Sequence, residues 1–305
     1  MLKVKKFCFA LLQYLPFIAI LFVFIKYYGY RELSLPQIES WPFFLCSLLS
    51  LFFVFFMRSV IWMYVLLICG LRINLKLAFV SKNIALLMKY IPGKVWAHAG
   101  TAGFLWKKGF APDRVFLLSL FTQILTIISG LLAGCFGMFF LDKNILEWEK
   151  SIFILLPLAV VFAVIYLCRN KLLEKMGPFW ALFRSFSIFR LVFIFVFYFV
   201  HWLVLGFSYL LLFNSLGFSL SGAVIFLQPL ANNIGMLAMF VPSGMGVREG
   251  MMALYLDQLG LGLAIGTYLA IISRIWFLLV EVILFFVSWI LELQSRLGSG
   301  AIARR

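Results

Sequence analysis

The sequence predicts an all-α polytopic membrane protein with about six transmembrane helices and two re-entrant helical hairpins arranged as inverted repeats. Of its 305 residues, 65% are hydrophobic and 12% are charged, whereas a soluble domain carries ~25% charged residues. Apolar runs long enough to cross a bilayer recur along the chain, and two more are interrupted by proline and glycine. The net charge of +15 lies in short clusters between these runs, which is typical of orientation signals and argues against nucleic-acid binding.

Predicted transmembrane helices lie at 7–28, 42–69, 115–140, 151–168, 190–213 and 263–291. Around them the chain divides into 1–41 (first transmembrane helix and outer loop), 42–140 (repeat A), 141–189 (connecting helix and cytoplasmic loop), 190–292 (repeat B) and 293–305 (basic cytoplasmic tail). With the N-terminus inside, most loop lysines and arginines fall on the cytoplasmic side, and Lys82 is counted among them. Both termini are therefore expected to be cytoplasmic.

Each repeat contains one interrupted apolar stretch, 76–107 in repeat A and 222–260 in repeat B. Tyr90-Ile-Pro-Gly-Lys94 interrupts the first, and Phe240-Val-Pro-Ser-Gly-Met-Gly-Val-Arg-Glu-Gly250 interrupts the second. A helix entering the second should break at Pro242, and a new one should begin near Gly246. Each half is then too short to cross the bilayer, so both stretches are interpreted as re-entrant hairpins. Residues 83–93 align without gaps on 233–243, which supports an inverted repeat, a recurrent plan of transporters.

The second helix of each hairpin is expected to begin near the membrane midplane, at about Gly93 and Gly246. Free N–H groups and the helix dipole favour an anion at such a position. Lys94 and Arg248 add a cation to the two helix starts, and an arginine binds phosphate through two parallel hydrogen bonds. The predicted substrate-binding residues are therefore Gly93, Lys94, Gly244, Gly246 and Arg248, with the deep cations Arg58 and Arg274. The alternative for Arg248 is a structural ion pair with Glu249 or Glu281.

Glu249 and Glu281 are predicted to form a coupling or ion-pair network with the deep arginines, either rearranging during transport or remaining static. Asn83, Asn233 and Gln228 are expected to make polar contacts within the hairpins, because polar side chains hydrogen-bond between membrane helices. The sequence contains no nucleotide-binding or metal-binding motif, so we expect no cofactor and no metal. Two carboxylates permit acid–base catalysis in principle, but nothing in the sequence brings them together, and an enzyme is not expected.

Several of these residues together resemble one membrane family. The shared features are Tyr90-Ile-Pro-Gly-Lys-Val-Trp96, Gly100, Lys107-Lys-Gly109, Pro242-Ser-Gly-Met-Gly-Val-Arg-Glu-Gly250 and Arg274. They resemble the lysylphosphatidylglycerol synthetase transmembrane-region family, of the flippase-domain type found in the bacterial multiple peptide resistance factor, over roughly 40–290. In related sequences an acidic–basic pair often follows the first hairpin. The matching residues here, 121–126, are neutral but polar, so the resemblance transfers no substrate or proton-coupling role to them.

The resemblance implies a multi-pass protein of the bacterial inner membrane that moves, or helps to present, a lipid with a charged or glycosylated headgroup. Because the chain ends at Arg305, the family's soluble aminoacyl-transferase domain is expected to be absent, and lysyl transfer with it. We expect a flippase for an anionic lipid, either a phospholipid or a polyprenyl-phosphate-linked precursor. The alternatives are a non-transporting lipid-binding partner of a separate lipid- or glycan-modifying enzyme, or a membrane-embedded headgroup transferase. The sequence leaves the oligomeric state open.

Overall fold

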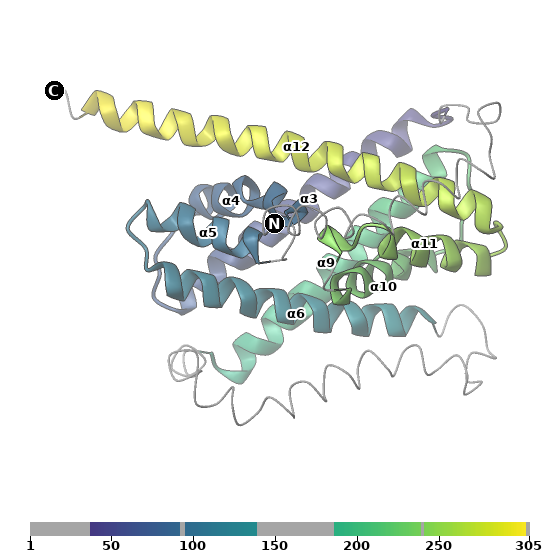
Figure 1. Cartoon of the computed structure of the whole chain (residues 1–305), viewed down its shortest axis with the longest axis horizontal. Helices are drawn as coiled ribbons and strands as arrows, with labels where there is room; N and C mark the ends of the chain where they lie inside the picture. Colours follow the sequence, from purple (N-terminus) through teal and green to yellow (C-terminus); the bar gives the residue numbers. More distant parts are fainter. Residues whose placement is uncertain (1–36, 92–94, 139–185, 239–240, 303–305) are drawn as a thin grey trace, which may run out of the picture.

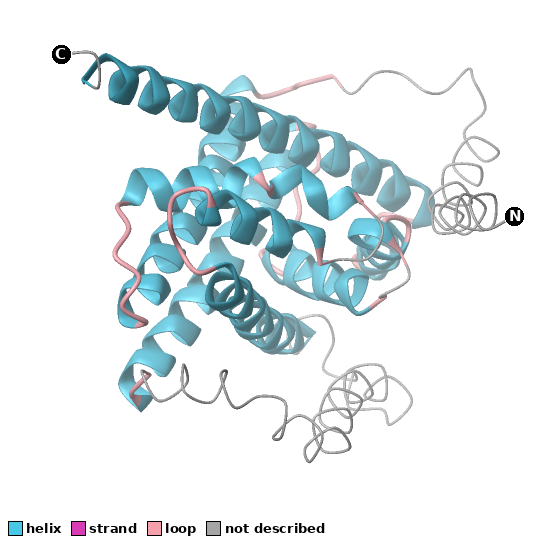
Figure 2. Cartoon of the chain, turned by 60° about the vertical axis from the view of Figure 1, so that its left-hand side comes forward, coloured by secondary structure: helices cyan, strands magenta, loops and turns pink. Residues whose placement is uncertain are grey.

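The computed structural model describes residues 37–91, 95–138, 186–238 and 241–302, and within these ranges the fold is helical without a strand (Figure 2). Within these described ranges, four helices are long and apolar enough to cross a membrane. They are α3 (Trp41–Ile68), α6 (Pro112–Met138), α9 (Ile188–Ser215) and α12 (Leu263–Ile302). Four of the predicted spans and the polytopic helical class are thus confirmed. The predicted helices at 7–28 and 151–168 lie outside the described residues.

Large apolar side chains cover much of the outer surface of these long helices. Leu49 is 68% exposed, Phe189 84% and Ile275 64%, and they come from three different helices. A water-soluble monomer rarely exposes contiguous apolar surface of this extent. The outer surface is therefore one that hydrocarbon chains of lipid would cover.

Two pairs of short helices separate the long ones. In the first half these are α4 (Leu75–Ile84) and α5 (Trp96–Trp106), with the 3-10 turn η1 (Leu86–Tyr90) between them. In the second half they are α10 (Val224–Leu237) and α11 (Val247–Gln258), with the 3-10 turn η2 (Pro242–Gly244). The longest of the four has 14 residues. At about 1.5 Å per residue, none spans a hydrocarbon core about 30 Å thick.

The helix breaks begin earlier in the sequence than expected. α10 ends at Leu237 and not at Pro242, whereas α11 begins directly after Gly246, as predicted. Ser243, Gly244 and Gly246 have φ of 52°, 65° and 85°, values that a right-handed helix does not contain. Three of the four positions from 243 to 246 are thus unavailable to either helix, and the break is long. In the first pair, α4 ends at Ile84, and α5 begins at Trp96 and not near Gly93.

The four long helices frame the two short pairs (Figure 1). α12 and α6 run along two sides of the molecule, α3 and α9 cross between them, and the two short pairs lie toward opposite ends. α12 packs on α4 and α11, while α6 packs on α5 and α10, and η1 touches η2. The helices α3, α4, α5 and α6 correspond in order to α9, α10, α11 and α12. Whenever two helices pack extensively on each other, their two counterparts are also in contact. The helices therefore contact one another in a two-fold pattern.

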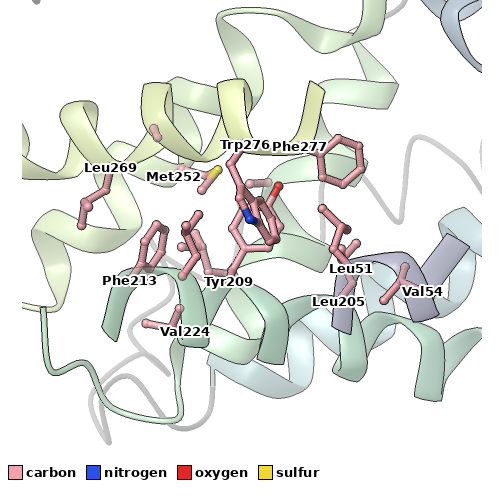
Figure 3. Close-up of a cluster of buried hydrophobic side chains, with 14 of the residues drawn as sticks. Leu51, Val54, Leu205, Tyr209, Phe213, Val224, Met252, Leu269, Trp276 and Phe277 are labelled. Atoms are coloured by element: carbon pink, nitrogen blue, oxygen red, sulfur yellow. The ribbon is translucent and has the colours of Figure 1, made fainter. Parts of the chain in front are cut away.

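The apolar core has two parts, both of which include α3 and α9. The larger part joins the first half of α3 to α9–α12, with Tyr209 and Trp276 in edge-to-face contact at a centroid distance of 5.2 Å (Figure 3). The smaller part joins the second half of α3 to α4, α5 and α6, with Trp62 fully buried. Edge-to-face aromatic pairs stabilise a core beyond the apolar area they bury.

Replacing Gly206 by alanine is expected to lower the free energy of unfolding by about 1–3 kcal/mol, the usual cost of overpacking. A Cβ on Gly206 would overlap the backbone carbonyl of Ile225, so α9 and α10 would have to separate. Thermal unfolding of the purified protein in detergent measures the loss. Gly103→Ala is the matched control, because no atom lies within 4 Å of a Cβ there. An equal melting temperature for the two variants would contradict the close contact.

Candidate functional site

A cavity of about 180 Å³ lies among α3, the first short pair, α6, α9 and the second helix break. Its charged lining side chains are all basic: Arg58 on α3, Lys82 on α4 and Lys89 on η1. No carboxylate lines it among the described residues. The neutral polar lining residues are His98, Thr101, Ser119, Thr122, Gln123, Thr126, Tyr198, His201, Asn232 and Ser243. The cavity is therefore a cationic, polar space enclosed by apolar helices.

Two of the lining cations have no acidic partner in the described part of the chain. Arg58 lies over the ring of Phe55, with its Cζ 5.4 Å from the centroid. Lys82 lies over Trp62 at 3.9 Å and donates a hydrogen bond of 3.1 Å to Ser119. Ser119 is also 2.8 Å from Nδ1 of His98. Aromatic faces and one hydroxyl offset only part of the cost of burying these charges, so the positive charge of both side chains is incompletely compensated in the described structure.

The third lining cation is neutralised. Lys89 forms an ion pair with Glu281 of α12, whose other carboxylate oxygen accepts a hydrogen bond of 2.8 Å from the Tyr90 hydroxyl. The Glu281 side chain is fully buried and that of Lys89 is 27% exposed. This pair attaches the first helix break to α12. The predicted ion-pair role of Glu281 thus has Lys89 as its partner, a residue that the sequence interpretation did not single out.

Arg274, two turns before Glu281 on α12, makes the equivalent attachment to the second break. Its guanidinium is 3.6 Å from a Glu249 carboxylate oxygen and donates a 3.1 Å hydrogen bond to Ser243. The other Glu249 oxygen accepts a 2.7 Å hydrogen bond from the Gly246 N–H. Glu249 therefore caps α11 and holds Arg274, which does not line the cavity. The substrate-binding role expected for Arg274 remains a prediction.

Arg248 is 2% exposed and lies in the apolar core, outside the lining of the cavity. It donates a 2.6 Å hydrogen bond to the Tyr209 hydroxyl and lies 5.5 Å from the centroid of Phe277. Its Nε has no hydrogen-bond partner in the described structure. Neither Glu249 nor Glu281 pairs with it, because each holds another cation. The ion pairs suggested as its structural alternative are therefore not formed, and its substrate-binding role remains a prediction.

Of the predicted glycine positions, two fall in the described structure, and both are shaped by the fold. Gly244 has φ 65°, and a Cβ there would lie 2.6 Å from the Gly235 carbonyl oxygen. Gly246, with φ 85°, is the residue before the first turn of α11. Both positions need a residue without a side chain. Gly93 and Lys94 lie outside the described residues.

The three amides expected to form hairpin contacts differ from one another in their hydrogen bonds. Asn83 and Asn233 donate to the carbonyls of Phe79 and Pro229, four residues earlier in their own helices. Gln228 is buried, and its amide has no hydrogen-bond partner within the described ranges. Local carbonyls compete effectively for short side chains in a helix. The hydrogen bonds of Asn83 and Asn233 thus lie within single helices, and polar contacts between helices through these amides stay a prediction.

The cavity includes residues that the sequence interpretation passed over. Lys82 was counted with the cytoplasmic loops, and Lys89 was not considered, although both interrupt an apolar stretch. Residues 121–126 of α6 were given no substrate role, yet Thr122, Gln123 and Thr126 line the cavity. The available signal was polarity within segments otherwise suited to lipid, since polar residues there usually face protein or a cavity. No sequence pattern indicated that α4, α6 and α9 line the same cavity.

These features define a class: a multi-pass helical membrane protein with an internal, cation-lined cavity between two helix–short pair–helix units. The chain belongs to the family described as "Lysylphosphatidylglycerol synthase TM region", whose model matches residues 10–285. This confirms the family resemblance drawn from the two interrupted stretches. No curated protein and no solved structure matches the chain.

Proposed function

We propose that this protein is a translocase that moves an anionic lipid across the membrane by passing its headgroup through the cavity. The lipid carries a phosphate, as a phospholipid or a polyprenyl-phosphate-linked precursor does. The observation that carries the proposal is the excess of positive charge in the cavity. Arg58 and Lys82 line it without an acidic partner in the described chain, and Glu281 neutralises Lys89.

The position of this charge supports transport of an anion. Cations within membrane segments are costly and typically mark a substrate pathway. In a low-dielectric interior, an anion entering the cavity gains more from two unpaired cations than it would in water. Glu249 and Glu281 are each held by their own cation and do not line the cavity. This arrangement favours transport over acid–base catalysis, and we propose no enzymatic role.

We further propose that the two halves are inverted repeats and that each short pair is a re-entrant hairpin. The two-fold pattern of helix contacts supports the repeat, and the length of the short helices supports the hairpins. In transporters of this plan, broken helices meet near the midplane at the substrate site. The contact between η1 and η2 next to the cavity fits that arrangement.

The orientation proposed is that of a bacterial inner-membrane protein with both termini in the cytoplasm. Lys108, in the loop between α5 and α6, is 2.9 Å from Glu292 near the end of α12, and Arg296 contacts the same carboxylate. The basic loop and the C-terminal end of α12 therefore lie at the same end of the molecule. The positive-inside rule assigns such an end to the cytoplasm.

The test is transport of a fluorescent phosphatidylglycerol by the purified chain in vesicles, read by chemical quenching of the outer leaflet. Arg58→Gln and Lys82→Gln are each expected to lower the rate at least about tenfold, as loss of a charge-assisted contact does. Arg114→Gln is the matched control, because this arginine is exposed and does not line the cavity. Its transport rate should equal that of the unchanged protein.

The outcome also separates the proposal from its alternatives. Binding of the labelled lipid without movement between leaflets would support a lipid-presenting partner of a separate enzyme. Covalent change of the lipid during the assay would support a transferase. Equal rates for Arg58→Gln, Lys82→Gln and Arg114→Gln would contradict passage of an anion through the cavity.

A further inference from the structure

Three neutral side chains in the cavity have hydrogen-bonding capacity that the described protein does not use. His201 on α9 is 3% exposed, and neither ring nitrogen has a hydrogen-bond partner among the described residues. The Asn232 side chain on α10 lines the cavity without a hydrogen bond to any described residue. Within the described ranges, the Gln123 amide on α6 donates only to the sulfur of Met236, at 3.2 Å. The unused donors and acceptors of these three side chains indicate a ligand with uncharged polar groups.

Such groups are normally satisfied in a folded protein. A neutral imidazole offers one donor and one acceptor, and a primary amide offers both. A hydroxyl group both donates and accepts, so it complements either side chain in either orientation. A phosphate alone would satisfy the donors but would leave the acceptors of His201, Gln123 and Asn232 unpaired. The ligand that matches this lining carries hydroxyls in addition to its anionic group.

An ammonium group does not match the cavity. Arg58, Lys82 and Lys89 line it, and the described lining contains no carboxylate. Glu281, which pairs with the lining residue Lys89, also accepts a hydrogen bond from the Tyr90 hydroxyl. Like charges repel strongly where water is scarce. An ethanolamine or aminoacyl headgroup would therefore be rejected by the residues that attract the phosphate.

We propose that the cavity selects a lipid whose phosphate bears a hydroxyl-rich headgroup without an amine, such as glycerol or a sugar. The phosphate lies at Arg58 and Lys82, and the hydroxyls lie at His201, Asn232 and Gln123. This inference rests on the proposed function, because it assigns the substrate class of the same cavity. The chemistry is common to glycerol-headed phospholipids and to polyprenyl-phosphate sugars.

Binding of four lipids to the purified full chain in detergent tests the inference, with native mass spectrometry as the readout. Phosphatidylglycerol is compared with phosphatidylmethanol, which has the same charge and no hydroxyl in its headgroup. The first is expected to bind about tenfold more tightly, as one or two added hydrogen bonds would give. Phosphatidylethanolamine and lysyl-phosphatidylglycerol should bind more weakly than phosphatidylglycerol. Equal affinity for phosphatidylglycerol and phosphatidylmethanol, or tighter binding of either amine lipid, would overturn the inference.

Variants separate this inference from the proposed function. His201→Leu and Asn232→Leu should lower affinity for phosphatidylglycerol to that for phosphatidylmethanol and leave the latter unchanged. Asn232 is only half-buried, so its variant serves if His201→Leu fails to fold. Arg58→Gln should weaken both lipids equally. If Arg58→Gln weakens both but neither leucine variant changes their ratio, the hydroxyl site is wrong and the anion site stands. If Arg58→Gln changes neither, the proposed function is wrong as well.

A second pair of ligands distinguishes the lipid source. Polyprenyl phosphate is compared with the same polyprenyl phosphate carrying one glucose. The glycosylated form is expected to bind about tenfold more tightly, for the reason given for phosphatidylglycerol. If it also displaces phosphatidylglycerol, the source is a polyprenyl carrier, and if phosphatidylglycerol prevails, the source is a glycerophospholipid. Tighter binding of the sugar-free form would contradict hydroxyl recognition.

Discussion

Replacing Lys89 by methionine is expected to lower the free energy of unfolding by about 3–5 kcal/mol, the cost of leaving a buried charge without its partner. The substitution keeps most of the side chain's volume but leaves the fully buried Glu281 carboxylate with only the Tyr90 hydroxyl. Removing the lysine should be more harmful than removing the glutamate, since Lys89 is 27% exposed and reaches the polar cavity. Denaturant-induced unfolding in mixed micelles measures the difference.

Two further variants isolate the ion pair as the cause. Lys89→Met combined with Glu281→Gln removes both charges, and a glutamine still accepts the Tyr90 hydroxyl, so the double variant should regain most of the lost stability. Lys107→Met removes an exposed lysine and should change stability by less than about 0.5 kcal/mol. A double variant no more stable than Lys89→Met alone would show that the lysine acts through packing.

Replacing Arg274 by methionine is expected to destabilise the protein by about 3 kcal/mol, at the lower end for a broken buried pair. Glu249 is fully buried and would lose its cation, while Ser243 would lose its donor at 3.1 Å. The loss should be smaller than for Lys89→Met, because Glu249 lies in the first turn of α11, where the helix dipole favours a carboxylate. The same unfolding measurement applies.

The control variant also removes the negative charge of Glu249, which the Arg274 substitution leaves without a partner. Arg274→Met with Glu249→Gln should recover stability, since a glutamine at this position still accepts the Gly246 N–H. The two sites share Tyr90, because Arg274 lies 5.2 Å from the centroid of its ring and its hydroxyl donates to Glu281. The effects of the two single variants are therefore expected to be less than additive when combined. A combined loss well below the sum would show that the two attachments form one cooperative network.

These two ion pairs give α12 a defined role. Glu281 attaches it to the first helix break, and Arg274 attaches it to the second. Both breaks lie beside the cavity, because Lys89 and Ser243 line it. A movement of α12 along its axis would therefore change both breaks together. Each ion pair thus links α12 to one of the two helix breaks, and the breaks contact each other at η1 and η2.

The apolar pattern of the sequence was sufficient for the class of fold. Trp41–Ile68 and Ile188–Ser215 match their predicted spans closely, because a bilayer imposes the same length and composition on every crossing. The restart of α11 was also predictable, since Gly246 is a position where only backbone without a side chain adopts the required φ. Membership of the family followed from the two interrupted stretches.

The residues that line the cavity were harder to predict from the sequence. Arg58 was singled out for its depth, and it does line the cavity. Lys82 was assigned to the cytoplasmic side, because a basic residue near the end of an apolar run indicates the orientation of a membrane helix. Only the tertiary structure shows that this helix belongs to a short pair beside the cavity. His201 and Asn232 carry no local motif, and their unpaired atoms are visible only once their neighbours are placed.

The sequence by itself determined the four described spans, the two stretches that contain the helix breaks and the family, because these depend on the length and composition of continuous segments. The tertiary structure decided which charges meet. Arg248 and Arg274 were both expected to bind substrate or to join a network with Glu249 and Glu281. In the structure Arg248 lies against Tyr209 in the core, and Arg274 pairs with Glu249. Arg58 and Lys82 remain without an acid in the described chain and face one cavity. Partner choice depends on distances across helices far apart in sequence, and those distances are set by packing.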